Sequence, residues 1–120
     1  MPLKFFNCLP WLVKRDKKQN AINDFYAIAS LLEKVLSKID DQTDIIYTHF
    51  EEADDLIKHI TKLIGKLKAF DYDPLDTVNI DFAPTGLYQE LSMQNNWSDE
   101  YLRMAREFDK IYDRLIKKKS

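Results

Sequence analysis

Two amphipathic segments dominate this chain, INDFYAIASLLEKVLSKI at residues 22–39 and IYTHFEEADDLIKHITKLIGKL at residues 46–67. In both segments apolar residues recur at alternating intervals of three and four, which places one apolar side chain per turn on a single face of an α-helix. No glycine or proline interrupts residues 11–63. The sequence therefore predicts helix through both segments. The repeating positions are Ile22, Phe25, Ala29, Leu32, Leu36 and Ile39, followed by Ile46, Phe50, Ala53, Ile57, Ile60, Ile64 and Leu67.

The two segments can be connected in two ways. Their apolar positions share one register, so a single helix over residues 20–68 is one alternative; it would be about 70 Å long and would dimerise as a coiled coil. The order of charges favours a hairpin of two helices, because lysines precede aspartates between residues 34 and 44. Cations are preferred at the end of one helix and anions at the start of the next. We expect the hairpin, with Asp41 or Thr43 as N-cap of the second helix.

Residues 70–84 have a different character. Pro74 and the aspartates around it favour a turn. Beyond this turn, Val78, Ile80 and Phe82 alternate with polar residues, which is the period of a half-buried strand. Because the sequence offers no convincing partner strand, we expect an extended segment packed across the bundle rather than a sheet.

The remainder of the chain predicts one short helix and one long helix. The short helix runs from Leu87 to Met93, and the long helix begins with Ser98 as its N-cap and acidic residues in its first turn. We therefore predict an all-α fold, an antiparallel helical bundle of three long helices plus one short helix, with an extended segment near residues 70–84. The length of the chain suits a single helical domain over residues 1–120.

The composition is typical of a globular protein, with 45% hydrophobic and 32% charged residues. One cysteine excludes an intramolecular disulfide framework and a four-cysteine zinc site. The net charge of −2 conceals a division, because residues 1–18 and residues 110–120 each carry +4 and residues 19–109 carry −10. An acidic body repels the phosphates of nucleic acids and attracts basic protein surfaces. We therefore expect a basic protein as the partner and no nucleic acid.

Residues 1–18 are an apolar run followed by a basic cluster. The apolar run is too short to cross a bilayer, and a secretory signal would carry its charges before that run, so a cytoplasmic protein is expected. Aromatic and basic side chains together also suit a membrane interface. The segment therefore either contacts a membrane surface or a partner, or folds back over the bundle, and we favour the second. Its candidate contact residues are Phe5, Phe6, Trp11, Lys14 and Arg15.

The candidate metal-binding and catalytic groups lack the patterns that such chemistry requires. His49, Glu52, Asp55 and His59 are spaced by three and four residues. Neither the Glu-x-x-His motif of di-iron bundles nor the His-Glu-x-x-His motif of zinc enzymes is present. The single cysteine has no nearby activating charge. We therefore predict no metal, no cofactor and no enzymatic activity, and we interpret both histidines as surface residues beside carboxylates.

Two groups of residues are candidates for binding a protein partner. One is an acidic cluster near the start of the second helix, for which the alternative interpretation is a solvated face. The other is an aromatic pair at the start of the last helix, which could anchor an interface or staple the helix entry. The residues are Glu51, Glu52, Asp54 and Asp55 in the first group and Trp97 and Tyr101 in the second.

The sequence thus predicts a non-catalytic protein-binding module, an inhibitor or immunity-type neutraliser of a basic partner protein. This analogy rests on charge and size alone. The alternative is a peripheral membrane-associated protein anchored by its N-terminal aromatic and basic segment. The sequence leaves the oligomeric state open between monomer and homodimer, because a single helix over residues 20–68 would need a second chain to cover its apolar face.

Overall fold

The computed structural model describes residues 10–119, which form five helices and, within that range, no strand. The helices are α2 (Pro10–Leu36), α3 (Ala53–Lys68), α4 (Leu75–Phe82), α5 (Leu87–Gln94) and α6 (Ser98–Lys119). The predicted all-α class is confirmed, and the short helix begins at Leu87 as the sequence predicts. The last helix begins one residue earlier than predicted, because Ser98 is its first helical residue and not its N-cap. Over the same residues, none of the helices is both long enough and apolar enough to pass through a bilayer.

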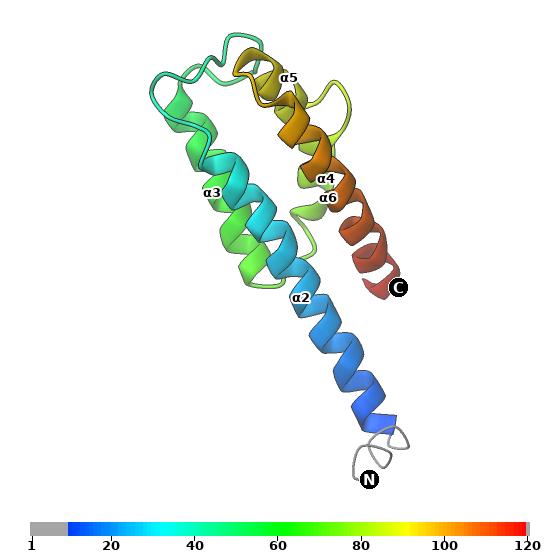
Figure 1. Ribbon diagram of the computed structural model, residues 1–120. Helices are drawn as coiled ribbons and strands as arrows, with labels where there is room; N and C mark the ends of the chain where they lie inside the picture. The colour runs from blue at the N-terminus through cyan, green and yellow to red at the C-terminus, as the bar shows by residue number, and fades with distance from the viewer. Residues whose placement is uncertain (1–9, 120) are drawn as a thin grey trace.

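The central element of the bundle is α2 (Figure 1). It packs against both α3 and α6 and runs antiparallel to both, while α4 and α5 pack against α6. The loop between α2 and α3 lies at one end of the molecule, next to the connection between α5 and α6. The basic start of α2 and the basic end of α6 lie toward the opposite end. The charge division in the sequence is therefore also a division in space.

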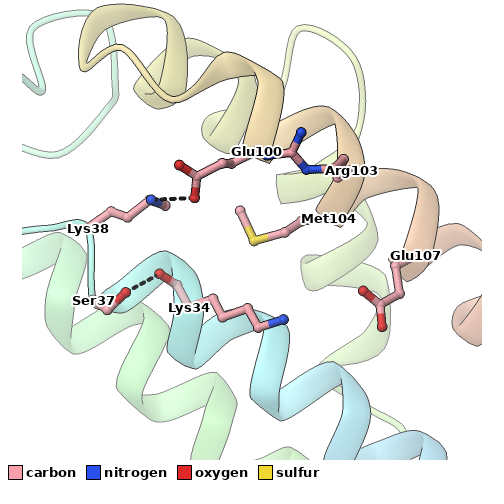
Figure 2. Close-up of a pocket in the computed structure, with 7 residues that line it drawn as sticks. All are labelled: Lys34, Ser37, Lys38, Glu100, Arg103, Met104 and Glu107. Carbon is pink, nitrogen blue, oxygen red and sulfur yellow. Dashed lines mark hydrogen bonds and ion pairs between the residues drawn. The ribbon is translucent and has the colours of Figure 1, made fainter.

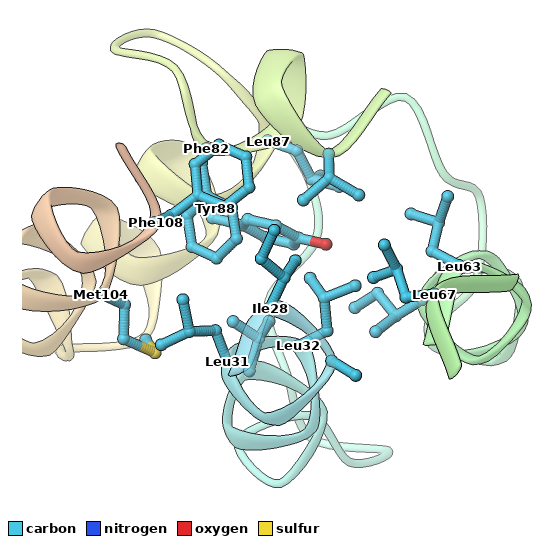
Figure 3. Close-up of a cluster of buried hydrophobic side chains, with 14 of the residues drawn as sticks. Ile28, Leu31, Leu32, Leu63, Leu67, Phe82, Leu87, Tyr88, Met104 and Phe108 are labelled. Carbon is cyan, nitrogen blue, oxygen red and sulfur yellow. The ribbon is translucent and has the colours of Figure 1, made fainter. Parts of the chain in front are cut away.

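The core forms where α2 faces α3 on one side and α4, α5 and α6 on the other (Figure 3). Ile28 and Leu32 of α2 are completely buried in it. On the α6 side, Phe82 stacks on Phe108 with ring centroids 4.9 Å apart and meets Tyr88 nearly edge to face at 4.7 Å. Full burial of one such side chain contributes about 1.5–3 kcal/mol. These contacts fix the helices that carry the surface described below.

The connection between α2 and α3 confirms the predicted hairpin and corrects its boundaries. Since α2 ends at Leu36 and α3 begins at Ala53, residues 37–52 form a loop. Neither Asp41 nor Thr43 caps the second helix, and the single-helix alternative is wrong.

Local hydrogen bonds explain why helix does not continue through this region. The backbone N–H of Asp40 donates to the Thr43 hydroxyl at 2.8 Å, and the backbone N–H of Gln42 donates to Asp40 Oδ1 at 2.8 Å. Short polar side chains that bond to nearby backbone groups compete with the helical hydrogen bonds. The apolar spacing at Ile46 and Phe50 therefore does not become a helical face.

The extended segment predicted near residues 70–84 is wrong, because this region contains the helix α4. Leu75, Val78 and Phe82, spaced by three and four residues, are buried on one face of that helix. Ile80, which the strand pattern places on the same side as Val78 and Phe82, is 66% exposed. Over so short a segment both periods fit the sequence, and packing against α6 selects the helical one.

Candidate protein-binding surface

Residues 37–52, which connect α2 and α3, are termed the acidic loop. Residues 40–55, which cover most of this loop and the first turn of α3, supply seven carboxylates and no lysine or arginine. Lys38, at the start of the loop, is paired with Glu100 of α6. All seven acidic residues are exposed. They are Asp40, Asp41, Asp44, Glu51, Glu52, Asp54 and Asp55. The four acidic residues predicted as partner contacts therefore all lie on the surface.

Little of this negative charge is neutralised locally. Asp54 Oδ2 lies 3.1 Å from Lys58 Nζ one turn later in α3. The pKa of Lys58 is raised, mainly by its hydrogen bond to Asp54 and to a smaller extent by the negative charge of that carboxylate. Glu51, Glu52 and Asp55 make no ion pair with any residue that the structure describes. Their charges are available to a partner.

The acidic loop is held in place by Asn95, which follows α5. The backbone N–H of Asp44 donates to Asn95 Oδ1 at 2.8 Å, and Asn95 Nδ2 donates to the backbone oxygen of Asp44 at 2.9 Å. The same Nδ2 also donates to the backbone oxygen of Leu91 at 2.8 Å. Within the loop, Asp44 Oδ1 accepts the backbone N–H of Ile46 at 3.1 Å. The loop is thus ordered before any partner arrives.

Two large apolar side chains project from the acidic loop. Ile46 is 74% exposed and Tyr47 is 75% exposed, the highest exposures among large hydrophobic residues in the described part of the chain. Ile45 and Phe50, on either side, pack partly against the core. Aromatic and aliphatic residues within a charged surround are typical of interface hot spots. No sequence pattern marks these two, because residues 46–67 fit a helical stripe.

His59 is not the surface histidine that the sequence predicts. Its side chain is 24% exposed, and its Nε2 lies 2.8 Å from Oδ2 of Asp81 on α4, where it donates to the carboxylate. Asp81 is only 6% exposed, although its alternation with Ile80 and Phe82 predicts a solvent-facing position. Sequence reasoning misses this pair because it depends on α4 being a helix. Among the described residues, no three His, Cys, Asp or Glu side chains are placed to hold a metal ion.

Trp97 and Tyr101 do not serve as exposed interface anchors. They are 6% and 4% exposed, and the Tyr101 hydroxyl donates to the backbone oxygen of Phe82 at 2.7 Å. Lys38 Nζ lies 5.7 Å from the centroid of the Trp97 ring. Both aromatic residues therefore belong to the core at the start of α6, which corrects the partner-contact interpretation.

The predicted N-terminal contacts lie at or beyond the limit of what the structure describes. Phe5 and Phe6 are outside the described residues, and the side chains of Trp11, Lys14 and Arg15 are also outside them. From residue 10 the backbone continues along the axis of α2, beyond the ends of α3 and α6 (Figure 1). Because residues 1–9 and the side chains through residue 17 lie outside the described residues, the interpretation that this segment folds back over the bundle stays a prediction.

A second polar surface lies in the cleft between α2 and α6 (Figure 2). Lys38 Nζ lies 2.5 Å from Glu100 Oε2, and this hydrogen bond lowers the pKa of the Glu100 carboxyl. Lys34, Arg103 and Glu107 line the same cleft. Cations and carboxylates are interspersed in this cleft, so it does not form a surface of a single charge sign. The pair of Lys38 with Glu100 instead links the end of α2 to α6.

Comparison with known proteins gives this chain no family. No family model, no curated protein and no solved structure matches it. We therefore infer its function from the surface described above.

Proposed function

We propose that this protein is a non-catalytic binding module that uses the acidic loop and the first turn of α3 to bind a basic surface on another protein. The observation that carries the proposal is the exposure of Ile46 and Tyr47 at 74% and 75% within a group of seven exposed carboxylates. A solvated charged face needs no exposed aliphatic and aromatic side chains at its centre. A protein interface uses both, since apolar anchors supply affinity and the surrounding charges supply association rate and selectivity.

The anchoring of the loop supports this proposal energetically. Binding through a mobile loop loses about 0.5–1.5 kcal/mol for each rotamer-rich side chain that becomes fixed, together with backbone entropy. The bonds between Asn95 and Asp44 have already fixed the backbone of the loop. Burial of Ile46 by a partner would contribute about 1.5–3 kcal/mol. More of that gain is then retained as affinity.

An inhibitor or immunity-type neutraliser is the class of binding module that fits these features. Such a protein acts by covering a basic functional surface, which requires complementary charge and a rigid shape and no chemistry of its own. The proposal therefore includes no cofactor and no metal. The alternative of a membrane-peripheral protein stays a prediction, because it depends on the side chains of residues 1–17, which lie outside the described residues.

The test begins with recovery of the partner by the tagged chain from its own cells, followed by measurement of binding rates with purified components. In the double variant Glu51→Lys/Glu52→Lys, we expect the association rate at low ionic strength to fall at least tenfold, because attraction to a basic surface becomes repulsion. The matched control is Glu107→Lys/Asp109→Lys on α6, which makes the same change in net charge outside the surface. An equal effect of both double variants would contradict a binding surface at the acidic loop.

The apolar part of the surface has its own test. We expect Tyr47→Ala to raise the dissociation rate at least tenfold and to leave the thermal unfolding midpoint unchanged, since the residue is 75% exposed. Tyr26→Ala, at a 47% exposed tyrosine of α2 outside the acidic loop, is the control. If Tyr47→Ala leaves the dissociation rate unchanged, Tyr47 is not an anchor.

A further inference from the structure

A cavity of about 290 Å³ opens between the acidic loop and the α4–α5 turn. Tyr47 lines it from the loop, Ile80 and Asp81 from α4, and Glu90 from α5. Gly86 forms part of the wall, where a Cβ atom would lie 2.5 Å from the backbone oxygen of Ile80. The turn can approach α4 this closely only because the residue has no side chain. The volume lies just below the range for ligand sites, roughly 300–1,000 Å³, and suits one side chain better than a larger molecule.

The acidic groups of this cavity lack a strong cationic partner. Asp81 is 6% exposed and has the His59 ring as its hydrogen-bond partner. Glu90 is half-buried and forms no ion pair with any of the described residues. No lysine or arginine lines the cavity. Partly buried carboxylates are stabilised by a cation close by, and here the chain offers only the imidazoles of His49 and His59, with no lysine or arginine in the lining.

Two exposed apolar side chains line the cavity. Tyr47 is 75% exposed and Ile80 is 66% exposed, and the two residues come from different elements. Apolar side chains beside carboxylates match a side chain that has an aliphatic stem and a cationic head. Lysine and arginine have this structure, and they bury the stem on apolar surface while the head stays in polar surroundings.

The cleft between α2 and α6 provides the contrast within the same molecule (Figure 2). There, Glu100 is already paired with Lys38, and Arg103 lines the same cleft. The cavity beside the acidic loop also has carboxylates, but no lysine or arginine lines it, and the His59 ring is the partner of Asp81. The two sites differ in whether the chain supplies a lysine or arginine as counterion.

We propose that this cavity binds one cationic side chain of the basic partner, arginine in preference to lysine. The inference rests on the proposed function and identifies where the partner's central charge is bound. The guanidinium fork can bond carboxylate oxygens in its own plane and can also stack on an aromatic ring. In this cavity Asp81 and Glu90 supply the oxygens and Tyr47 supplies the ring.

The test uses the full chain and small probes, so that it does not depend on the partner. Amide chemical shifts are followed by NMR during titration with N-acetyl-arginine methylamide at low ionic strength. We expect saturable shifts centred on Thr85, Gly86 and Leu87, weaker shifts with the lysine analogue, and none with the uncharged citrulline analogue. Glu90→Gln should weaken binding of the arginine probe at least fivefold, whereas Glu107→Gln, the same change on α6, should leave it unchanged.

Two results would overturn the inference. One is equal binding of the arginine and citrulline probes, and the other is an equal effect of Glu90→Gln and Glu107→Gln. The proposed function fails separately, when the Glu51→Lys/Glu52→Lys variant binds the partner as the parent chain does. If that variant loses partner binding while Glu90→Gln binds the partner unchanged, the surface is correct and the cavity is not the arginine site.

Discussion

Two buried tyrosines allow one substitution to be tested in two opposite environments. Tyr88 and Tyr101 are 0% and 4% exposed. The Tyr101 hydroxyl donates to the backbone oxygen of Phe82 at 2.7 Å and lies 3.3 Å from that of Ala83. The Tyr88 hydroxyl is buried without a hydrogen-bond partner among the described residues. Replacing each tyrosine by phenylalanine removes one oxygen atom and leaves the ring in place.

The expected free energies of unfolding change in opposite directions. Tyr101→Phe removes a hydrogen bond with a net worth of about 0.5–1.5 kcal/mol and leaves a buried carbonyl oxygen with one donor fewer, so we expect a loss of about 1–2 kcal/mol. An unpaired buried hydroxyl costs about 1–3 kcal/mol, and Tyr88→Phe removes it. We therefore expect Tyr88→Phe to raise stability by about 1 kcal/mol.

Chemical denaturation of both variants and the parent chain measures these changes. A change of 1 kcal/mol corresponds to a shift of about 4 °C in the midpoint of thermal unfolding for a chain of this size, which gives a second readout. The reasoning is refuted if Tyr88→Phe destabilises the protein as much as Tyr101→Phe. That result would mean that the Tyr88 hydroxyl makes a stabilising hydrogen bond in solution.

Three further predictions concern the glycines, the acidic loop and the response to alkali. Gly86→Ala should lower the free energy of unfolding, measured by urea denaturation, by at least about 1 kcal/mol, because the added Cβ would lie 2.5 Å from a backbone oxygen. Gly65→Ala, in α3 where an added Cβ meets no atom within 4 Å, should raise the free energy of unfolding by about 0.5–1 kcal/mol. Asn95→Ala removes the acceptor of the Asp44 amide, so hydrogen exchange of that amide should become at least tenfold faster. The helix content measured by circular dichroism should stay unchanged. Unchanged exchange would show that other contacts hold the loop. Burial raises the pKa of Tyr88 well above 10.0, so the folded state holds this proton more tightly than the unfolded state does. The free energy of unfolding should therefore fall as pH rises past about 10. In an ultraviolet titration, Tyr88 should ionise only when the protein unfolds. Ionisation of all six tyrosines before unfolding would contradict that assignment.

The elements that sequence patterns predict well are those in which local propensity and packing agree. The apolar spacing of residues 22–36 becomes the buried face of α2, and that of residues 53–67 becomes the buried face of α3. Ile46 and Phe50 continue the same spacing and still lie in a loop. Short polar side chains before Ile46 form hydrogen bonds to the backbone that compete with those of a helix. Periodicity alone does not indicate which of the two sets of hydrogen bonds is more stable.

The candidate surface divides in the same way between local and non-local features. The exposure of the acidic residues follows from their charge, and the sequence predicts it. The anchor at Asn95 and the pair of His59 with Asp81 join segments 51 and 22 residues apart in the chain. Such contacts exist only once the helices have been placed against one another. Trp97 was equally suited by type to a core or to an interface, and only its packing separates the two.

The separation of charge along the bundle has a consequence for how the protein meets another molecule. With a net charge of −2, the chain is pulled only weakly toward a basic surface as a whole. Its acidic loop and its basic helix ends nevertheless form an electric dipole along a molecule 58 Å in its longest dimension. A dipole in a field experiences a torque, so the molecule turns before it is drawn in. Salt limits the distance over which the field of the basic surface exerts this torque to about 8 Å at physiological ionic strength and about 30 Å at 0.01 M. At low ionic strength the protein therefore approaches a basic surface with its acidic loop facing that surface. Added salt mainly removes this orientation during the approach.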